Sequence, residues 1–511
     1  MKRHSLATAV DLGSTIAKAA LVRRGRRAFR VIPRGYAPVY DEEQSCRTAL
    51  VEALGMGVMS GTPTGPLTEN GWTGPVAMTS TLGGPVRVLA AGWRGSAVES
   101  AAGTLLAGTG CVVTGWAGAA DAAERPPRPT PGCGRNAPDL LLCLGPPVSH
   151  KSFHPSWFIP FTERVSGRPV LYDGEPGGFG FLKARLGERG VAWARDGRAL
   201  AEATGKVRVA RAAGAFEGIL EHLAGVSAGA EPWRLVAPDD AIEKFLGVLV
   251  RDGFDRVAYL DVGSSMTRLV ASGRDGSRAR FTAPVGTGRG AASALDLESG
   301  GAADPELEDW AANRASRPWS VPDTPGDLAR ERRVALACAR HAFHSCSMRG
   351  MRFPPEERSL VVVGGGTFRF TGDWAVQLDL FVGALKPVGV FRFAVDAACA
   401  AMHVGAVVSA FGTEPGAAPG GAFESLADVG QVVAVRPGCD GEAARLEVEG
   451  LGEFEVRAGS VVSLPLPLGR KSRAKVVPLR GADAGAGPGE SADFEVVGGL
   501  SGLVIDARVV N

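Results

Sequence analysis

An acidic octapeptide rich in small residues occurs twice in the chain, and this repeat constrains the fold more than any other feature. Residues 11 to 18 read DLGSTIAK, and residues 261 to 268 read DVGSSMTR. Each copy follows an apolar run, LATAV or RVAYL, and precedes another, AALV or LVAS. A strand, a glycine turn and a second strand form a β-hairpin whose tip carries backbone donors. Two such hairpins, far apart in the chain, indicate an internal duplication.

The tips of these hairpins carry the groups that hold a phosphate chain with bound magnesium. Such a chain requires backbone N–H groups at a tight turn, hydroxyl donors, and a carboxylate that holds metal-bound water. Asp11 and Asp261 begin the two copies, and we assign them as catalytic residues that orient Mg²⁺ through water. The residues predicted to contact the phosphates are Gly13, Ser14, Thr15 and Lys18 in the first copy, and Gly263, Ser264, Ser265 and Thr267 in the second. Asp-Xaa-Gly also occurs in ordinary turns, so the repeat favours this function more than either copy alone.

A third element lies in the stretch SLVVVGGGTFRF. Leu360 to Val363 form an apolar run typical of a buried strand, and Gly364, Gly365 and Gly366 follow it directly. We interpret these glycines as a turn against which a flat ring lies. The alternative interpretation is a tight strand-to-helix turn with no ligand.

In their order along the chain, these three elements resemble the phosphate-1, phosphate-2 and adenosine elements of the actin, sugar-kinase and Hsp70 superfamily. The resemblance implies ATP and Mg²⁺ as cofactors. It also implies an α/β chain with a duplicated actin-like (ribonuclease H-like) two-lobe ATPase fold, in which the nucleotide lies between the lobes. The first lobe is predicted over residues 1–235 with the phosphate-1 hairpin, and the second over 236–410 with the phosphate-2 and adenosine elements and a returning helix.

Beyond the second lobe the chain changes character. A linker is predicted at 411–424, because FGTEPGAAPGGAFE is rich in Gly, Ala and Pro. From 425 to 511, short runs such as QVVAVRP and EFEVRAG are separated by Gly and Pro, which predicts a small C-terminal all-β domain. The low-complexity stretches 115–136 and 299–327 are interpreted as surface insertions.

Helices are predicted at 239–252, with Asp239 or Asp240 as the cap, at 327–346 and at 396–409. The last of these carries Ala and Gly at positions where a neighbouring backbone can approach closely. We therefore expect this helix to pack between the two lobes.

Within the superfamily, stretches along nearly the whole chain resemble the glutamate mutase L family. They are AMTSTLGGPVRVLAAG (77–92), ESAAGTLLAGTG (99–110), APDLLLCLG (137–145), GRPVLYDGE (167–175), ALACARHA (335–342), LKPVGVFRFAVD (385–396) and VVGGLSGLVIDAR (496–508). The last is the most specific, because kinases of the superfamily have no such ending. The resemblance implies an ATP-dependent reactivation or repair chaperone whose protein partner is an adenosylcobalamin-dependent mutase or aminomutase.

One stretch departs from the family pattern. After the strand DLLLCLG the family usually has a segment of the form GGTDGG, whereas this chain has GPPVSHK at 145–151. Two prolines remove backbone donors, and the acidic side chain is absent. ATP binding is therefore indicated more strongly than ATP hydrolysis, and a catalytically impaired nucleotide-binding scaffold stays open as an alternative. A small-molecule kinase is the other alternative, and it would need a carboxylate between the lobes to deprotonate its substrate.

Composition limits the remaining function classes. Lys and Arg number 56 against 54 Asp and Glu, so no excess of positive charge points to nucleic acid as a partner. No run of apolar residues is long enough for a membrane span, and a cytoplasmic location is expected. The eight cysteines include no CxxC pair and are predicted to be reduced and mostly buried. The histidine clusters HKSFH (150–154) and HAFHSC (341–346) are interpreted as packing or surface residues rather than metal ligands.

Overall fold

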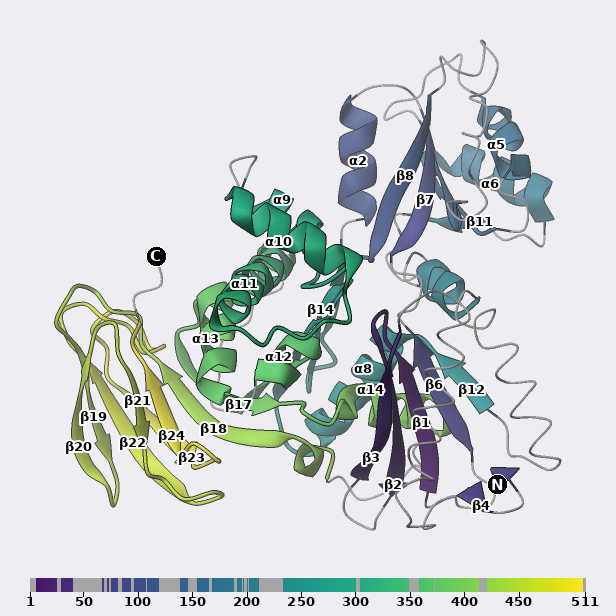
Figure 1. The fold of residues 1–511 in the computed structure, drawn as a ribbon. Helices are drawn as coiled ribbons and strands as arrows, with labels where there is room; N and C mark the ends of the chain where they lie inside the picture. The colour runs from purple at the N-terminus through teal and green to yellow at the C-terminus, as the bar shows by residue number, and fades with distance from the viewer. Residues whose placement is uncertain are drawn as a thin grey trace.

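The computed structural model describes most of the chain, and its structure is discussed for those residues alone. They are 6–24, 29–39, 67–68, 71–72, 75–80, 85–92, 96–106, 108–118, 138–145, 154–164, 168–187, 191–194, 196, 200, 202–210, 233–299, 304–348, 358–371, 373–412 and 421–508. The fold is mixed α/β, as predicted, and contains several separate sheets (Figure 1).

The phosphate-1 hairpin belongs to a five-stranded sheet. Its order is β12 (Trp233–Val236), β6 (Val76–Ser80), β1 (Leu6–Leu12), β2 (Ile16–Arg24) and β3 (Phe29–Pro38). β1, β2 and β3 form an antiparallel meander, and β6 and β12 continue the sheet in parallel on the other side of β1. The meander therefore places the first octapeptide at the turn between β1 and β2.

The phosphate-2 hairpin belongs to an eight-stranded sheet. Its order is β15 (Arg278–Ala283), β14 (Thr267–Gly273), β13 (Arg256–Val262), β16 (Ser359–Gly364), β17 (Gly389–Val395), β18 (Ala427–Ala434), β24 (Leu503–Asp506) and β21 (Val461–Leu464). Its first five strands repeat the antiparallel meander and the two added parallel strands of the first sheet. This repeated connectivity supports the duplication inferred from the two octapeptides.

A separate parallel sheet is inserted in the chain between β6 and β12. Its order is β11 (Val191–Trp193), β10 (Val170–Asp173), β9 (Leu140–Leu144), β7 (Val86–Gly92) and β8 (Cys111–Gly118), and every neighbouring pair is parallel. Its helices include α2 (Ser96–Leu106), α5 (Ile159–Arg164) and α6 (Pro176–Leu186). We call this unit the inserted sheet; the sequence did not predict it as a sheet of its own. Of the stretch 115–136, β8 contains the first residues, and the rest lies outside the described residues.

The predicted helices form with shifted ends. They are α8 (Pro238–Arg251), α11 (Pro325–Met348) and α14 (Ala400–Phe411). Asp239 and Asp240 do not cap α8, because the helix begins at Pro238 and Ala237 is the N-cap. The predicted start of α14 was too early, since Asp396 follows β17 and accepts hydrogen bonds from the amides of Ala400 and Ala401.

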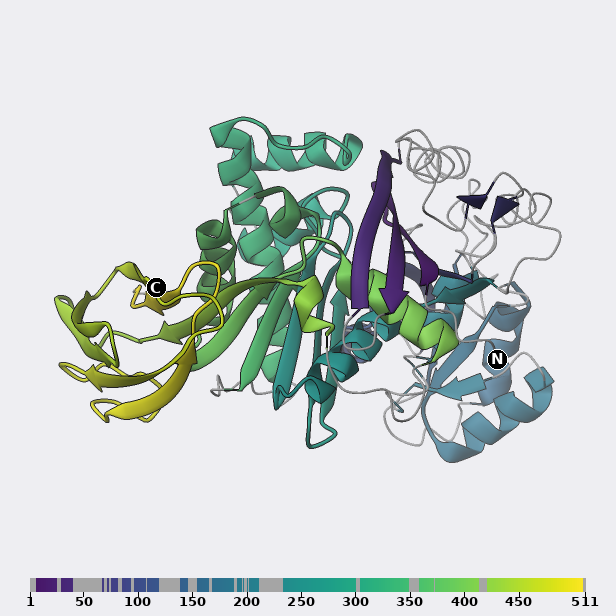
Figure 2. The same ribbon diagram turned by 90° about the horizontal axis from the view of Figure 1, so that it is seen from below.

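The helix pair α8 and α14 lies between the first sheet and the eight-stranded sheet (Figure 2). A Cβ on Gly405 of α14 would lie 1.9 Å from the carbonyl oxygen of Ala241 in α8, so the two backbones touch. α14 also packs on β1, and α8 packs on β13 and β14. This arrangement confirms that the last predicted helix packs between the lobes.

The C-terminal segment consists of strands, as predicted, and divides between two sheets. β20 (Gly452–Arg457), β19 (Glu442–Val448), β22 (Lys471–Pro478) and β23 (Ala492–Val497) form an antiparallel sheet of their own. β18, β24 and β21 instead extend the eight-stranded sheet. Most of the predicted linker lies outside the described residues, and the domain boundaries stay predictions.

The remaining helices flank the eight-stranded sheet. They are α9 (Ala291–Ser299), α10 (Pro305–Ser316), α12 (Gly366–Thr371) and α13 (Trp374–Leu385). Among the helices that the structure describes, none combines the length and the apolar character that a membrane span requires.

Candidate functional site

The two octapeptides form hairpins of the same geometry. Asp11 lies opposite Lys18 across the first hairpin, and Asp261 lies opposite Arg268 across the second. At the first tip the amide of Gly13 donates to the carbonyl of Ile16 at 3.0 Å. The amide of Gly263 makes the corresponding bond at the second tip, also at 3.0 Å. The repeat in sequence is thus a repeat in structure.

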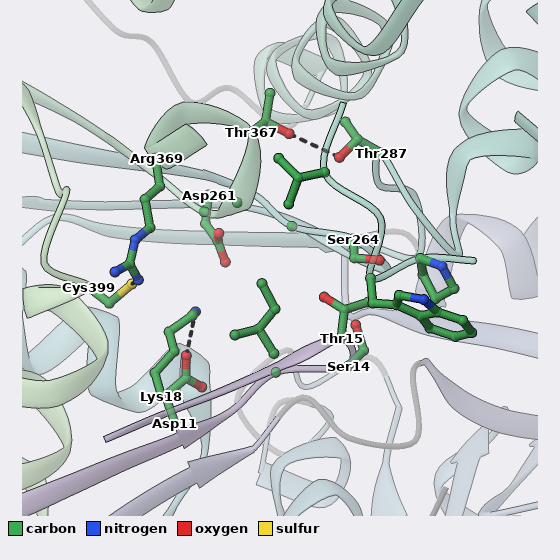
Figure 3. Close-up of a pocket in the computed structure, with 18 of the residues that line it drawn as sticks. Asp11, Ser14, Thr15, Lys18, Asp261, Ser264, Thr287, Thr367, Arg369 and Cys399 are labelled. Carbon is green, nitrogen blue, oxygen red and sulfur yellow. Dashed lines mark hydrogen bonds and ion pairs between the residues drawn. The ribbon is translucent and has the colours of Figure 1, made fainter. Parts of the chain in front are cut away.

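Both hairpin tips line one pocket of about 940 Å³, part of which is open to solvent. Of the predicted site residues, the lining includes Asp11, Gly13, Ser14, Thr15, Lys18, Asp261, Gly263, Ser264, Gly365 and Gly366. Figure 3 shows Lys18 and Asp11 on one side of this pocket and Asp261 on the opposite side.

Three predicted site residues lie near the pocket without lining it. Ser265 donates from Oγ to Oγ of Ser14 at 2.7 Å, so the two hairpin tips are in direct contact. Thr267 instead donates to the carbonyl oxygen of Val285 and is fully buried. Gly364 ends β16, where a Cβ would lie 2.1 Å from the hydroxyl of Tyr259.

Each hairpin carboxylate is paired with the cation opposite it. Lys18 Nζ lies 2.9 Å from Oδ2 of Asp11, and Thr79 Oγ1 donates to Oδ1 of the same carboxylate at 3.2 Å. In the second hairpin Arg268 lies 2.8 Å from Oδ2 of Asp261. We predicted Lys18 as a phosphate contact, and this ion pair adds the role of balancing the buried charge of Asp11.

The two equivalent carboxylates differ in their pKa. Burial raises the pKa of Asp11, but Lys18, His403 and Thr79 together outweigh it, and the net effect is a lowered pKa. Burial raises the pKa of Asp261, and Arg268 opposes this shift without reversing it. The lowered pKa keeps Asp11 ionised at neutral pH. The raised pKa of Asp261 means that protonating this carboxylate requires less free energy than protonating Asp11.

Arg268 is shared between two carboxylates. Its Nε donates to Oδ1 of Asp239 at 2.9 Å, while its Nη1 donates to Oδ2 of Asp261 at 2.8 Å. Asp239 is 3% exposed, and although burial raises its pKa, Arg208 and Arg268 lower it to about 2. Sequence reasoning missed this role, because an acidic residue in the first turn of a helix ordinarily interacts with the helix N-terminus. No pattern in the sequence distinguishes the buried Asp239 from the exposed Asp240.

The glycine turn lies directly against the phosphate-2 hairpin. Gly365 has φ +92°, and a Cβ there would lie 2.5 Å from Oδ1 of Asp261 and 2.4 Å from the carbonyl oxygen of Val262. Only glycine allows this approach without moving the carboxylate. The predicted adenosine element and the second phosphate element are therefore neighbours in space.

A polar cluster next to this turn also lines the pocket. The hydroxyls of Thr287 and Thr367 lie 3.0 Å apart, and Thr367 donates to Glu331 of α11 at 3.3 Å. Arg314 of α10 contacts the other carboxylate oxygen of Glu331 at 3.4 Å. Burial raises the pKa of Glu331 although Arg314 is beside it. Thr367 belongs to the stretch SLVVVGGGTFRF, but sequence reasoning assigned it no role, and Thr287, Glu331 and Arg314 belonged to no identified motif.

The stretch 299–327 is only partly the surface insertion that we predicted. It contains α10, and the segment after that helix contributes Pro318, Trp319, Ser320, Val321 and Pro322 to the pocket lining. Proline and serine are common in exposed loops, and their composition does not show which loop covers a site.

Cys399 is a further lining residue that sequence reasoning missed. It is the N-cap of α14 with φ 54°, and Arg369 contacts its sulfur at 3.6 Å. Burial raises the pKa of this thiol, although Lys18 lies close enough to oppose the shift. Of the cysteines that the structure describes, five are buried and Cys439 is exposed, all without disulfides. The burial of five of these six cysteines confirms the prediction that they are mostly buried.

Of the departure at GPPVSHK, the structure describes the first residue alone. Gly145, the first residue of that stretch, directly follows β9 of the inserted sheet and does not line the pocket, and 146–151 lie outside the described residues. His154 accepts a hydrogen bond from the amide of Ser156 at the start of a short helical turn. Within the described ranges, no three His, Cys, Asp or Glu side chains gather as metal ligands.

No protein-family model matches the chain, and no curated protein matches its sequence. Several solved structures are similar to it at a distance. A nucleotide-free acetone carboxylase is 13% identical over 89% of this chain and 81% of that chain, with a TM-score of 0.32. Component A of (R)-2-hydroxyglutaryl-CoA dehydratase from Acidaminococcus fermentans is 8% identical over 80% and 97%, at 0.29. A glycerol dehydratase reactivase is 11% identical over 75% and 95%, at 0.28.

Proposed function

We propose that the chain binds ATP with Mg²⁺ in the pocket between the two hairpins. One observation carries the proposal: two hairpins of the same geometry, each with a carboxylate paired to a cation, line opposite sides of one pocket. A symmetrical arrangement of turns, hydroxyls and balanced charge suits a phosphate chain, whose oxygens require donors from both sides.

The lining residues divide into groups by chemistry. Hydroxyl donors come from Ser14, Thr15 and Ser264, and positive charge comes from Lys18 and Arg268. Asp11 and Asp261 would hold the water bound to Mg²⁺, which when present neutralises the phosphate oxygens. The Gly365 and Gly366 turn, with Glu331 and Thr367 beside it, receives the adenosine end of the nucleotide.

The two hairpin tips are in contact, so a nucleotide that binds between them would change how the two lobes are held together. Ser265 and Ser14 touch in this structure, and phosphate oxygens that accept from the tip hydroxyls would replace that contact. A ligand shifts a conformational equilibrium only by its difference in affinity for the two states. Because the bond between the tips must break for the hydroxyls to bind phosphate, ATP would have different affinities for the states with and without that bond.

The cellular role that we propose is reactivation or repair of an adenosylcobalamin-dependent mutase or aminomutase. This part rests on the sequence resemblance to the glutamate mutase L family, above all on the ending VVGGLSGLVIDAR. The distant structural matches carry no part of it. Nucleotide-dependent movement of the lobes would open the partner enzyme and release damaged cofactor.

A nucleotide-binding scaffold with impaired hydrolysis is the second candidate. It is favoured by the ion pairs at both hairpins, since water on Mg²⁺ must compete with Lys18 for Asp11 and with Arg268 for Asp261. The departure GPPVSHK at 145–151 favours it as well, since the acidic side chain of the family pattern is absent there.

ATP binding and turnover are tested on the purified full-length protein. Calorimetry with Mg·ATP measures affinity, and phosphate release measures turnover, for the wild type and for Asp11→Asn and Asp261→Asn. Each carboxylate substitution is expected to weaken binding about tenfold or more and to abolish turnover, because hydrogen bonds to charged groups are each worth about 1.5–3 kcal/mol. Asp255→Asn, which removes a surface carboxylate paired with Arg274, is the matched control and should match the wild type.

The outcomes separate the candidates. Binding with turnover supports the ATPase, whereas binding without turnover in the wild type supports the scaffold. Turnover that appears only with a small hydroxylated substrate, with a phosphorylated product, would establish the kinase alternative instead. Absence of ATP binding contradicts the proposal as a whole, and failure to co-purify any cobalamin-dependent mutase with or without nucleotide contradicts the partner.

A further inference from the structure

Three segments that are far apart in the sequence meet at Asp239. Arg268 of the phosphate-2 hairpin donates to Oδ1 of this carboxylate at 2.9 Å. Arg208, in the helical residues 202–210 that follow the inserted sheet, donates to Oδ2 at 2.6 Å. Thr282 of β15 contributes a third contact to Oδ2 at 3.3 Å. One buried carboxylate thus connects the eight-stranded sheet, which we call the nucleotide lobe together with the helices packed on it, to the segment that follows the inserted sheet.

The chain of contacts continues at both ends. Arg268 also pairs with Asp261, which lines the nucleotide pocket. Arg208 donates from its other nitrogen to the carbonyl oxygen of Thr109 at 2.6 Å, in the turn that leads into β8. Successive contacts therefore link Asp261, Arg268, Asp239, Arg208 and Thr109, and we call this series of residues the Asp–Arg chain.

The turn before β8 is held against the nucleotide lobe by backbone bonds as well. The amide of Gly110 donates to the carbonyl of Thr282, and the amide of Thr282 donates to the carbonyl of Gly108, both at 2.7 Å. A Cβ on Gly110 would lie 2.2 Å from a guanidinium nitrogen of Arg208. The junction therefore has no free space, and a shift of Arg208 must move the turn or break its bonds.

Burial makes this chain sensitive to a change at either end. Arg268 is 2% exposed, Asp239 3% and Arg208 8%, so water cannot replace a lost partner. Removing one member of a buried ion pair leaves an uncompensated charge, which is far more costly than losing a surface pair. A change at Asp261 is thus transmitted to Asp239 through the arginine that the two carboxylates share.

The first hairpin lacks the corresponding connection. Among the described residues, the carboxylate of Asp11 is bonded to Lys18 of β2 and Thr79 of β6, which belong to the same sheet as Asp11 itself. The two hairpins are equivalent in fold, but of the pairs described here only the second is bonded to the inserted sheet. Both hairpin carboxylates have a cation that balances their charge. Charge balance alone therefore does not require the further bonds from Arg268 to Asp239 and from Asp239 to Arg208, which indicates that they serve to connect the two regions.

We propose that the Asp–Arg chain couples the occupancy of the nucleotide pocket to the docking of the inserted sheet on the nucleotide lobe. When bound, hydrated Mg²⁺ would compete with Arg268 for the carboxylate of Asp261, and a phosphate oxygen would compete with Asp261 for the guanidinium of Arg268. The bonds from Arg268 and Arg208 to Asp239 then change in length, and Arg208 shifts relative to the carbonyl oxygen of Thr109. Asp239 and Arg208 act here as positioning residues, since neither lines the pocket.

The first test uses hydrogen–deuterium exchange without nucleotide, on peptides that contain Gly110, Thr282 and residues 202–210. Asp261→Asn is expected to speed exchange in these peptides about fivefold or more, as is Asp239→Asn. Asp11→Asn, in the equivalent hairpin, should leave them unchanged. Asp240→Asn is the matched control for Asp239, because it removes the same charge from the same helical turn at an exposed position.

The second test compares the wild type with and without Mg·ATP, and this arm rests on the proposed function. Binding is expected to change exchange in the same peptides about fivefold or more, and Asp239→Asn should bind ATP yet lose the change. ATP binding with unchanged exchange at Gly110 would overturn the coupling and leave the proposed function standing. If ATP does not bind, the proposed function fails, and the Asp261→Asn arm alone decides the coupling: unaltered exchange there overturns it. Should Asp239→Asn fail to fold, the wild-type and Asp261→Asn comparisons decide the outcome without it.

Discussion

Asp11 and Asp261 occupy the same position on two hairpins of the same connectivity, yet their surroundings differ. Asp11 has Lys18 and the hydroxyl of Thr79 as partners, whereas Asp261 shares Arg268 with Asp239. A cation that serves one carboxylate stabilises its charge more than a cation divided between two. Burial raises the pKa of both carboxylates, and the partners of Asp11 reverse that shift whereas those of Asp261 do not.

His403 gives a pH dependence that can be measured. It is 3% exposed, and burial lowers its pKa from 6.5 to about 4, with Asp11 nearby opposing the shift and Lys18 adding to it. Below pH 6.5 the unfolded chain takes up a proton that the folded protein refuses. The free energy of unfolding should therefore be unaffected by this group above pH 6.5 and fall by about 3 kcal/mol as the pH drops to about 4.

Urea unfolding at a series of pH values checks this expectation. His403→Gln should show a shallower loss of stability between pH 6.5 and 4 than the wild type, whatever its stability at neutral pH. His344→Gln, which removes an exposed histidine, is the matched control and should keep the wild-type slope. Parallel curves for the wild type and His403→Gln would contradict the assignment.

At the scale of elements, the helix pair α8 and α14 connects the two sheets through a close backbone contact. Gly405 faces Ala241 across this contact. The apolar side chains on both helices join a single core with β13 and β16. Movement of one sheet relative to the other must therefore act on this helix pair.

Gly405→Ala is expected to destabilise the protein by about 1–3 kcal/mol, because its Cβ would lie 1.9 Å from a carbonyl oxygen and force the helices apart. Gly247→Ala, on the other helix of the pair, is the control. Its Cβ would lie 3.9 Å from Arg251, so better helix propensity should stabilise the protein by about 0.5–1 kcal/mol. Urea unfolding of both variants measures the difference, and equal stabilities would show that the helices are not in such close contact.

At the scale of the molecule, the C-terminal strands complete the sheet that carries the phosphate-2 hairpin. β18 pairs with β17, and Arg392 on β17 donates to Asp428 on β18 at 3.0 Å. Arg508, near the end of the described chain, donates to Asp379 of α13. The C-terminal strands are therefore bonded directly to the sheet that carries the phosphate-2 hairpin.

A chain that ends at Gly412 should aggregate rather than fold. Its β17 would become an edge strand with unpaired backbone groups and would lose the apolar cover over Val390 and Phe391. Size-exclusion chromatography of this truncation, beside a control chain that ends at Arg508 and keeps all described strands, measures the effect. A monomeric, folded truncation would instead show that 425–511 is the separable domain that the sequence predicted.

The sequence by itself determined the local features of this protein. The two octapeptides specified two glycine-turn hairpins, since the positions of Asp, Gly and apolar residues within a few residues set a turn between strands. The glycines at 364–366 likewise specified a sharp turn after a buried strand. Helical periodicity identified α8, α11 and α14 but not their first residues, because N-terminal caps depend on contacts outside the helix.

Only the tertiary structure decided which distant residues meet. Asp239 reads as an ordinary residue of a first helical turn, and its burial between Arg208 and Arg268 depends on three segments converging. The same holds for Trp319, which lies in a Pro-rich stretch and lines the pocket, and for Gly145, which follows a strand of a separate sheet. Local propensity acts over a few residues, whereas burial and charge pairing depend on how whole elements pack, which a single sequence does not display.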